Sequence, residues 1–373
     1  MKIATIKGIG IKIHLSTLII VGLVGFYAAS FYISIIPNAT VIDIFTVGLL
    51  NGLIILISIL IHELSHSIMA QRYGLDVKEI ELYLFGGVSK IEEEPKTPKS
   101  EMIITIVGPL SSLVIGAILL IINILPISIP ALFSFTLFYS GISNIGLGVF
   151  NLLPAFPIDG GRILRAFLWK RRDNLISATK TASKVGVVFG YGLIIYGFFQ
   201  IFTFGFINGL WLILMGSFLN SSARQSYTQT INEVALSNIS AKEILNLPNL
   251  EIPFEITILE ALRDYFFPYK RSYFPIAQNK KIVGLVHIED IKKIPIQQRS
   301  KIIIGYIMRK ISDFPNIDAD DTGKEVMKKL RQSGKKPYIG IVREKSNEEL
   351  IGFIAEDELI SSLKFWSLNI KGS

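Results

Sequence analysis

The residues best suited to chemistry are two histidines and a glutamate in the segment 61–66, whose sequence is IHELSH. On a helix, positions i and i+4 share one face, so His62 and His66 can bind the same metal ion. Glu63 lies about 100° round such a helix, where its carboxylate can reach a water on that ion. The pattern is typical of sites in which zinc, held by two imidazoles, activates water for hydrolysis.

This motif follows a long apolar run, Phe45–Ile61, that contains no charged residue. Two imidazoles and a carboxylate at membrane depth are costly unless something binds them. His62 lies about eight residues from the cytoplasmic end of the expected span, roughly 12 Å deep at 1.5 Å per residue, and water can reach that depth through a polar cleft. A bound metal ion is the simplest explanation.

Catalytic zinc usually takes three protein ligands and leaves a fourth position open to water. Of the four histidines, the other two are His14, near the start of the first span, and His287, in the C-terminal part. Among acids at membrane depth, Asp43 is at the outer side, whereas Asp159 ends the fourth span on the cytoplasmic side. Elimination therefore predicts Asp159 as the third ligand.

The segment around Asp159 also indicates a site. Its prolines and glycines over 154–161 break helical hydrogen bonding beside the bilayer. Irregular backbone is tolerated there only if it is buried in protein or lines a wet cavity. Asn151, three residues before this segment, adds an amide that can orient a substrate carbonyl or a water.

The composition predicts how these residues are positioned. The chain has 373 residues, of which 50% are hydrophobic and only 18% charged, with apolar runs up to about residue 220 and charges concentrated after 232. We expect a membrane domain over 1–225 and a soluble domain over 236–373. The expected spans are about 13–36, 45–70, 102–125, 131–153, 185–203 and 205–220.

Positive charge alternates between the connecting segments. The connections 37–41 and 126–130 have no Lys or Arg, whereas the segments after the second and fourth spans are rich in them. The positive-inside rule then places both termini in the cytoplasm of a multi-pass protein of the cytoplasmic membrane. These flanks explain the net charge of +8, and no basic stripe interleaved with aromatics suggests nucleic acid. The absence of cysteine excludes disulfides and thiolate zinc sites.

HELSH at 62–66, followed by N-x-x-P-x-x-P-x-D-G-G over 151–161, resembles the site-2 protease family of intramembrane zinc metalloproteases. The resemblance extends to Phe85-Gly86-Gly87 and to Gly108-Pro109, a pair that we expect to serve helix packing.

This resemblance implies zinc-dependent cleavage of a membrane-spanning protein substrate within the lipid bilayer, as regulated intramembrane proteolysis. Zinc would be held by His62, His66 and Asp159, with Glu63 as the catalytic acid–base and Asn151 as an accessory residue.

Residues 78–91 alternate and contain a glycine pair, so we expect a strand whose exposed edge pairs with an extended substrate. Proline substitutions over 82–84 would then reduce cleavage without loss of zinc.

A faint internal repeat begins at about residue 240, with Gly284 and Gly352 at corresponding positions. It is similar to a pair of cystathionine-β-synthase (CBS) domains, over about 238–300 and 301–366. That resemblance implies an adenine nucleotide as ligand and a homodimer formed through these domains.

The repeat departs from the CBS pattern at the ligand positions. The hydroxyl residue expected three positions after each glycine is His287 in one copy and Ala355 in the other. The acid expected six positions after each glycine is Asp290 in the first copy and Glu358 in the second. Two alternatives stay open. The repeat is a nucleotide site that uses Asp290, or it is a domain that binds no ligand and gates the cytoplasmic opening of the active site.

The sequence thus predicts a polytopic α-helical membrane protein with about six transmembrane helices and a C-terminal cytoplasmic α/β CBS pair. The main hypothesis is an intramembrane zinc endopeptidase, regulated by the CBS pair. The alternative is a CBS-regulated channel or transporter with a structural metal site. That alternative would spread polar residues along several spans, whereas here they concentrate in the second and fourth. A non-catalytic relative is a third hypothesis, and intact Glu63 argues against it.

Overall fold

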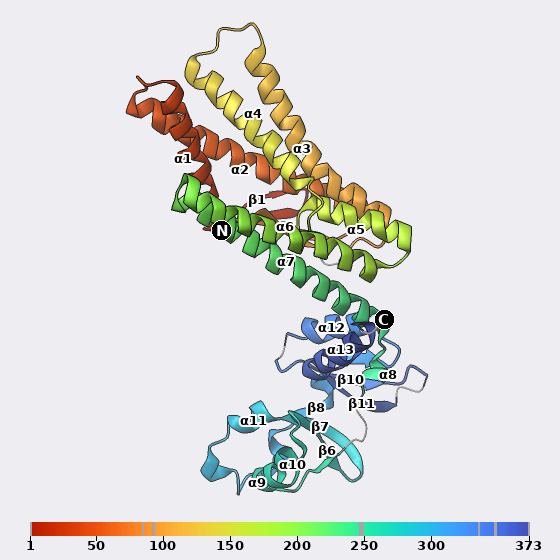
Figure 1. Ribbon diagram of the computed structural model, residues 1–373. Coiled ribbons are helices and arrows are strands. Elements are labelled where there is room, and N and C mark those ends of the chain that lie inside the picture. The colour runs from red at the N-terminus through yellow and green to blue at the C-terminus, as the bar shows by residue number, and fades with distance from the viewer. Residues whose placement is uncertain are drawn as a thin grey trace. The chain divides into compact units, whose positions relative to one another are not determined.

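The computed structural model describes residues 2–83, 86–91, 94–245, 250–334, 336–346 and 349–371. The chain divides into two compact units, Met1–Thr228 and Gln229–Ser373. Long helices dominate the first unit, and the second is built of short strands and helices (Figure 1). Phe85, part of the motif at 85–87, lies outside the described residues.

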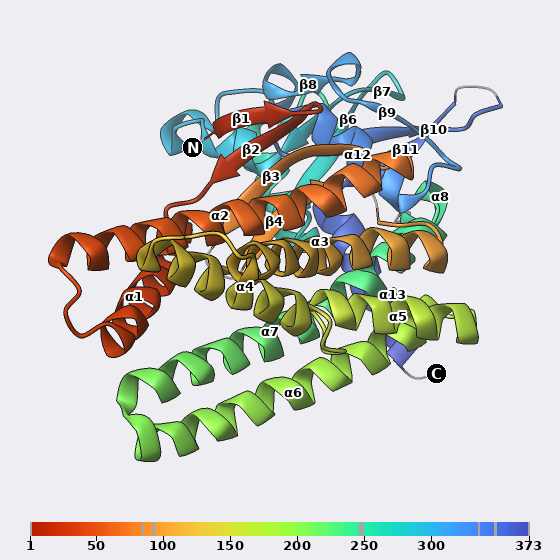
Figure 2. The same ribbon diagram turned by 90° about the horizontal axis from the view of Figure 1, so that it is seen from above.

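Five helices of the first unit are long and apolar enough to cross a bilayer. They are α1 (Thr17–Ile35), α2 (Val41–Arg72), α3 (Pro98–Ile124), α4 (Ala131–Asn151) and α6 (Leu175–Phe204). The sixth expected span, 205–220, lies in α7 (Phe206–Asn238), which is not among the five found in the described residues. It stays a prediction. Helices α6 and α7 form an antiparallel pair (Figure 2).

Polar side chains cap the N-termini of two helices in the first unit. Asp43 completes a capping box with Thr40 at the start of α2, so its role is to satisfy backbone groups. Thr97 and Ser100 form an equivalent box at the start of α3, with Pro98 as the first helical residue. Helix α3 therefore begins four residues before the expected span start at 102, which brings Glu101 inside the helix.

A four-stranded sheet lies within the first unit, in the order β1-β2-β3-β4. Its strands are β1 (Lys2–Ile6), β2 (Ile9–Ile13), β3 (Val77–Tyr83) and β4 (Gly86–Ile91). Ile9, Ile80 and Leu82 are fully buried in the core that this sheet forms with residues of α2. The strand expected over 78–91 is a hairpin of β3 and β4, and β4 ends the described sheet order.

The break after the fourth expected span is larger than the sequence suggested. Helix α4 ends at Asn151, and Asp159 is the first residue of a separate helix, α5 (Asp159–Arg172). A Cβ on Gly160 would lie 2.2 Å from the carbonyl oxygen of Leu153, and one on Gly161 would lie 2.3 Å from the Phe156 nitrogen. Only glycine lets the chain fold back so tightly, and this turn directs Asp159 toward α2.

The second unit contains two modules, each with a strand hairpin. The first has the sheet order β5-β6-β7-β8, and the second has β11-β10-β9. Their strands are β5 (Ile252–Pro253), β6 (Tyr273–Gln278), β7 (Lys281–His287), β8 (Arg309–Lys310), β9 (Asn316–Asp318), β10 (Ile339–Arg343) and β11 (Leu350–Ala355). Their helices include α9 (Ile258–Ala261), α10 (Phe267–Tyr269), α11 (Ile288–Lys292), α12 (Gly323–Gln332) and α13 (Glu356–Lys371).

One short helix precedes the first module in sequence but packs in the second. Helix α8 (Ala241–Ile244) precedes the first module in sequence, but Ala241 and Ile244 lie in the core of the second module, with Ile317 and Val326. The Ala241 backbone N–H donates to the carbonyl of Asp321, which fixes this placement. The second module therefore includes residues that precede the first module in sequence, so the two modules do not simply follow one another along the chain.

Candidate metal centre

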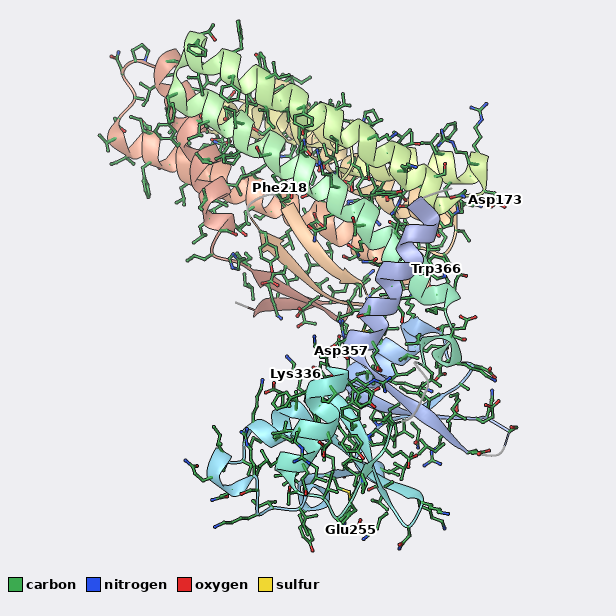
Figure 3. The ribbon with its side chains drawn as sticks, turned by 60° about the horizontal axis from the view of Figure 1, so that its bottom comes forward. Asp173, Phe218, Glu255, Lys336, Asp357 and Trp366 are labelled. Carbon is green, nitrogen blue, oxygen red and sulfur yellow. The ribbon has the colours of Figure 1, made fainter. Side chains whose placement is uncertain are left out.

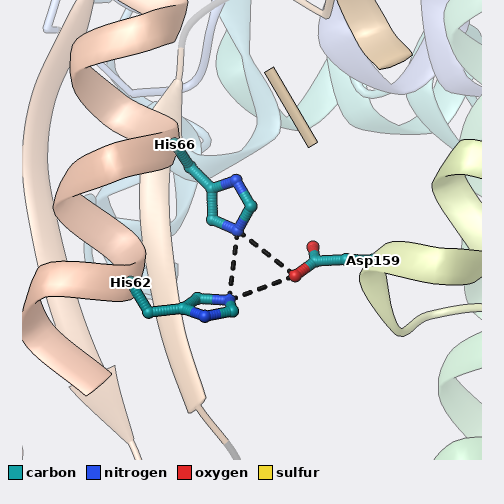
Figure 4. Close-up of side chains that lie close together, drawn as sticks. All are labelled: His62, His66 and Asp159. Carbon is teal, nitrogen blue, oxygen red and sulfur yellow. Dashed lines mark hydrogen bonds and ion pairs between the residues drawn. The ribbon is translucent and has the colours of Figure 1, made fainter. Parts of the chain in front are cut away.

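Three predicted site residues converge in the first unit. His62 and His66 project from α2, and Asp159 faces them from the start of α5 (Figure 4). The Asp159 Oδ2 atom lies 3.1 Å from His62 Nε2 and 3.2 Å from His66 Nε2. The two Nε2 atoms are themselves 3.2 Å apart. All three side chains are at most 14% exposed.

Helix α3 holds the far side of both imidazoles. His66 Nδ1 lies 2.8 Å from the carbonyl oxygen of Ile104, and His62 Nδ1 lies 2.9 Å from Ser112 Oγ. A carbonyl can only accept, so Nδ1 of His66 carries the proton. In the neutral ring, Nε2 then directs a lone pair toward Asp159. This is how metal-binding histidines are oriented in proteins.

Gly108 of α3 makes room for the two rings. A Cβ at this position would lie 2.1 Å from His66 Nε2 and 2.8 Å from His62 Nε2. Any side chain would therefore occupy the space in front of both nitrogen atoms. The expectation that Gly108 serves packing between helices was incomplete, because it also clears the face of the triad.

The geometry fits a small divalent cation. Two ring nitrogens and a carboxylate oxygen, brought within 3.2 Å of one another, need a proton or a cation among them. Ligand atoms of a tetrahedral zinc site with bonds of about 2.0–2.1 Å lie about 3.3 Å apart, close to the spacing here. Two imidazoles and one carboxylate also match a catalytic zinc set that keeps one open position.

The other two predicted site residues of the first unit, Glu63 and Asn151, have different surroundings. Glu63 follows His62 on α2, is half-buried, and is near enough to act electrostatically on the His66 ring. Asn151 is the last residue of α4, where its side-chain N–H donates to the carbonyl of Leu147 over 3.0 Å. That bond uses one amide N–H within its own helix and leaves the second available.

Asp290 belongs to the second unit, and the structure surrounds it with cations. Its carboxylate accepts from Arg309 Nε at 2.9 Å, from Arg309 Nη2 at 2.8 Å and from Lys293 Nζ at 2.8 Å. Burial raises the pKa of this carboxyl, but the hydrogen bonds to Arg309 and Lys293 outweigh it and leave the pKa below its ordinary value. The acid is thus already neutralised by its neighbours.

A cavity of about 590 Å³ lies beside this cluster. Its lining includes Lys293, Arg309, Lys336 and Asp357, but not Asp290 (Lys336 and Asp357 are labelled in Figure 3). His287 also lines the cavity; its Nδ1 accepts from the Glu289 backbone N–H and caps α11. Desolvation lowers the pKa of His287, so its ring is neutral near pH 7.

Sequence reasoning missed three residues that support the triad. Ser112 orients His62, and the buried Glu101 binds the buried Arg165 of α5. The sequence contains a signal for two of them. Glu101 and Ser112 are eleven residues apart, about three helical turns, which places them on one face of a helix.

Comparison with known proteins identifies the relatives of this chain. The family model described as peptidase family M50 matches residues 52–128 and 126–193. A zinc metalloprotease of Methanocaldococcus jannaschii is 32% identical over 336 residues, which covers 88% of each chain. Rip3 of Mycobacterium tuberculosis is 28% identical over 84% of this chain and 81% of its own. Because the first unit ends at Thr228, both matches extend well into the second unit.

Solved structures give two further similarities. The site-2 protease from Methanocaldococcus jannaschii is 31% identical and covers 60% of this chain and 94% of its own, with a TM-score of 0.42. The CBS domain of a bacterial CNNM/CorC family Mg²⁺ transporter in complex with ATP is 16% identical, covers 38% of this chain and 97% of its own, and has a TM-score of 0.32. The sequence relationships over nearly the full length are decisive: the chain belongs to peptidase family M50, the site-2 protease family of intramembrane zinc metalloproteases.

Proposed function

We propose that His62, His66 and Asp159 hold the zinc ion of this protease and that Glu63 is its catalytic acid–base. The observation that supports this most strongly is the convergence of two Nε2 atoms and one carboxylate oxygen within 3.2 Å. Ile104 and Ser112, by binding both Nδ1 atoms, keep the Nε2 atoms directed at the same point.

Zinc bound there supplies Lewis-acid chemistry, which makes water acidic enough to attack at neutral pH and polarises the scissile carbonyl. Glu63 takes the proton of the attacking water and returns it to the leaving amine. The half-buried position of Glu63, one residue from a ligand, suits this role. Asn151, with an amide N–H free of the helix bond to Leu147, would donate to the substrate carbonyl near this centre.

The test is cleavage of a single-span substrate by the purified full-length protein and its Glu63→Gln variant. Loss of a general acid–base should slow cleavage by about 10²–10⁴-fold. Zinc content should stay at the wild-type level, because Glu63 is not a ligand. Glu233→Gln on α7 is the matched control and should cleave normally. Equal turnover by Glu63→Gln and wild type would remove Glu63 from the mechanism.

We propose that the substrate is a membrane-spanning protein, which unwinds locally and pairs as an extended strand with β4. The support is the sheet order, because β4 pairs with β3 on one side and ends the described sheet on the other. Main-chain hydrogen bonds to such an edge bind any extended sequence. They would hold a substrate backbone straight without selecting particular side chains.

Two proline variants of β4 test this edge. Successive residues of an antiparallel strand direct their N–H groups to opposite sides, so one of Val88 and Ser89 donates toward β3 and the other away from it. Proline at the outward residue removes one donor to the substrate and leaves the hairpin with β3 intact. We expect the variant that keeps the wild-type melting temperature to cleave more slowly with unchanged zinc. Normal cleavage by that variant would exclude strand pairing at β4.

We further propose that both termini and the second unit are cytoplasmic. The second unit would regulate cleavage by binding an anionic ligand, and the resemblance to CBS domains implies an adenine nucleotide. Support comes from the cavity of about 590 Å³, whose lining includes Lys293, Arg309 and Lys336 as donors for a phosphate. The acids Glu289, Glu356 and Asp357 line the same cavity, so the site would rest on these donors and not on a net positive charge. The neutralised Asp290 does not line that cavity, so the ligand would be bound through phosphate rather than through this acid. The homodimer through the second unit stays a prediction.

A thermal-shift titration of the full-length protein with ATP, ADP and AMP tests this. A shift that saturates with one nucleotide, and that is lost in Lys336→Met, would support a phosphate site. A flat response to all three would leave a domain that acts without a nucleotide. The alternative of a channel or transporter loses its basis, because the chain belongs to a protease family.

A further inference from the structure

Two oppositely charged side chains are buried in the first unit next to the metal centre. Glu101, in the first turn of α3, is 1% exposed, and Arg165 of α5 is 2% exposed. Arg165 Nε donates to Glu101 Oε1 over 2.7 Å, and Arg165 Nη2 donates to the same oxygen. The other carboxylate oxygen, Oε2, has no hydrogen-bond partner in the described part of the chain. Burying a charged pair whose bonds are incomplete costs stability, so stability alone does not explain this pair.

The Glu101 side of the pair belongs to the surface that orients the histidines. Glu101, Ile104, Gly108 and Ser112 follow one another along one face of α3. The carbonyl of Ile104 and the hydroxyl of Ser112 hold the two Nδ1 atoms, and Gly108 lies against the two Nε2 atoms. The position of α3 therefore sets the position of both imidazoles.

The Arg165 side of the pair belongs to the element that carries Asp159. Arg165 lies on α5, six residues after Asp159. Its guanidinium carbon lies 5.2 Å from the centre of the Phe156 ring, which is in the loop that leads into Asp159. Arg165 thus contacts α3 through Glu101 and the loop through Phe156, and its Nη2 atom also lies 3.6 Å from Glu94 Oε2. Arg162 of α5 is a weaker second partner of Glu101, with its Nε atom 3.9 Å from Oε1.

We infer that Glu101 and Arg165 form a positioning pair, which holds the Asp159 carboxylate at the correct distance and orientation relative to the His62 and His66 imidazoles. This inference rests on the proposed function, since that distance and orientation matter only if the triad binds zinc. The pair touches neither zinc nor substrate. It connects the helix that orients two ligands with the helix that carries the third.

The experiment measures the zinc affinity of the detergent-purified full-length protein by chelator competition, alongside its melting temperature in excess zinc. Arg165→Met should lower zinc affinity, by no more than the roughly 10–100-fold that follows removal of a group bound directly to a metal ligand. Arg224→Met is the matched control, because Arg224 joins α7 to α6 through Tyr191, and it should bind zinc normally. Arg165→Lys keeps the charge but not the forked geometry, and should lose less affinity than Arg165→Met.

The double variant Glu101→Met/Arg165→Met separates positioning from stability. It removes both buried charges, so its melting temperature should recover from that of Arg165→Met. Positioning predicts that its zinc affinity stays low, because the link between α3 and α5 is still absent. Recovery of zinc affinity together with the melting temperature would show a purely structural pair and overturn the inference. So would wild-type affinity in Arg165→Met or, if that variant does not fold, in Arg165→Lys.

The outcome for the proposed function is read separately. If the wild type itself binds no zinc, the assignment of the triad fails before the pair is tested. If the wild type binds zinc and the Arg165 variants bind it equally well, only the positioning role fails.

Discussion

Two carboxylates with little exposure to solvent, one in each unit, have opposite surroundings. Asp159 faces two imidazole nitrogens, which carry no net charge in the neutral rings, and within the described ranges its ion-pair partners are those two rings. Asp290 is bound by a guanidinium and an ammonium, both positively charged without any external ion. We propose that a cation from solution completes the first arrangement, whereas the second is complete as folded. Burial of an acid is therefore a weak indicator of a metal site, and the charge of its partners is a strong one.

The largest effect should come from filling the space in front of the imidazoles. In Gly108→Ala the new methyl group would lie 2.1 Å from His66 Nε2, so a ring must move out of the site. We expect loss of zinc and loss of cleavage, measured by metal analysis and by the substrate assay. Gly146→Ala on α4 is the control, because a Cβ there has nothing within 4 Å. If Gly108→Ala kept both zinc and activity, the described arrangement of the rings would be wrong.

A smaller effect should follow from releasing one imidazole. Ser112→Ala removes the partner of His62 Nδ1 and leaves the ligand itself in place. We expect zinc affinity to fall by about 10–100-fold with an unchanged fold. Ser111→Ala is the neighbouring control, because Ser111 donates back to its own helix, at the carbonyl of Gly108. If Ser111→Ala lowered zinc affinity as much as Ser112→Ala, the effect would come from removing any hydroxyl of α3 and not from the hydrogen bond to His62.

The smallest effect on the metal centre should come from the other carboxylate. Asp290→Asn should leave zinc and cleavage unchanged but should destabilise the second unit by about 1–3 kcal/mol, because Arg309 and Lys293 lose an ionised acceptor. Urea unfolding of the full-length protein, read by proteolysis of the second unit, measures this. Any loss of zinc would contradict the contrast between the two carboxylates.

The same variant should remove a pH dependence. The folded pKa of Asp290 is below its ordinary value of 3.8, so its contribution is fully present above that value. It is lost as the pH falls through the lower, folded pKa. Wild type should therefore lose stability in this acid range relative to Asp290→Asn, and parallel curves would show that Asp290 gains nothing from its partners.

The convergence of His62, His66 and Asp159 could be predicted from the sequence because the spacing of the histidines is local and acids at this depth are rare. His62 and His66 share a helix face by spacing, and Asp159 was the remaining acid at the right depth. Ser112 and Arg165 could not be assigned in the same way. Their roles depend on which faces of α3 and α5 turn toward one another, and a single sequence does not specify helix rotation.

The fold was predictable to a similar limit. Apolar length indicated the long helices, and alternation indicated the strands of β3 and β4. The N-terminal hairpin was missed, because Ile9–Ile13 continues almost directly into the apolar run of α1 and no strong break separates them. The separate start of α5 was missed for a different reason: the glycines after Asp159 suggested the end of a helix, whereas they lie in the first turn of one.

The most direct test is the zinc content of the detergent-purified wild type and of its Asp159→Ala variant. Elemental analysis should find close to stoichiometric zinc in the wild type and a large loss in the variant, since two imidazoles alone make an incomplete site. Wild type without stoichiometric metal, or an Asp159→Ala protein that retains it, would contradict the assignment of this triad.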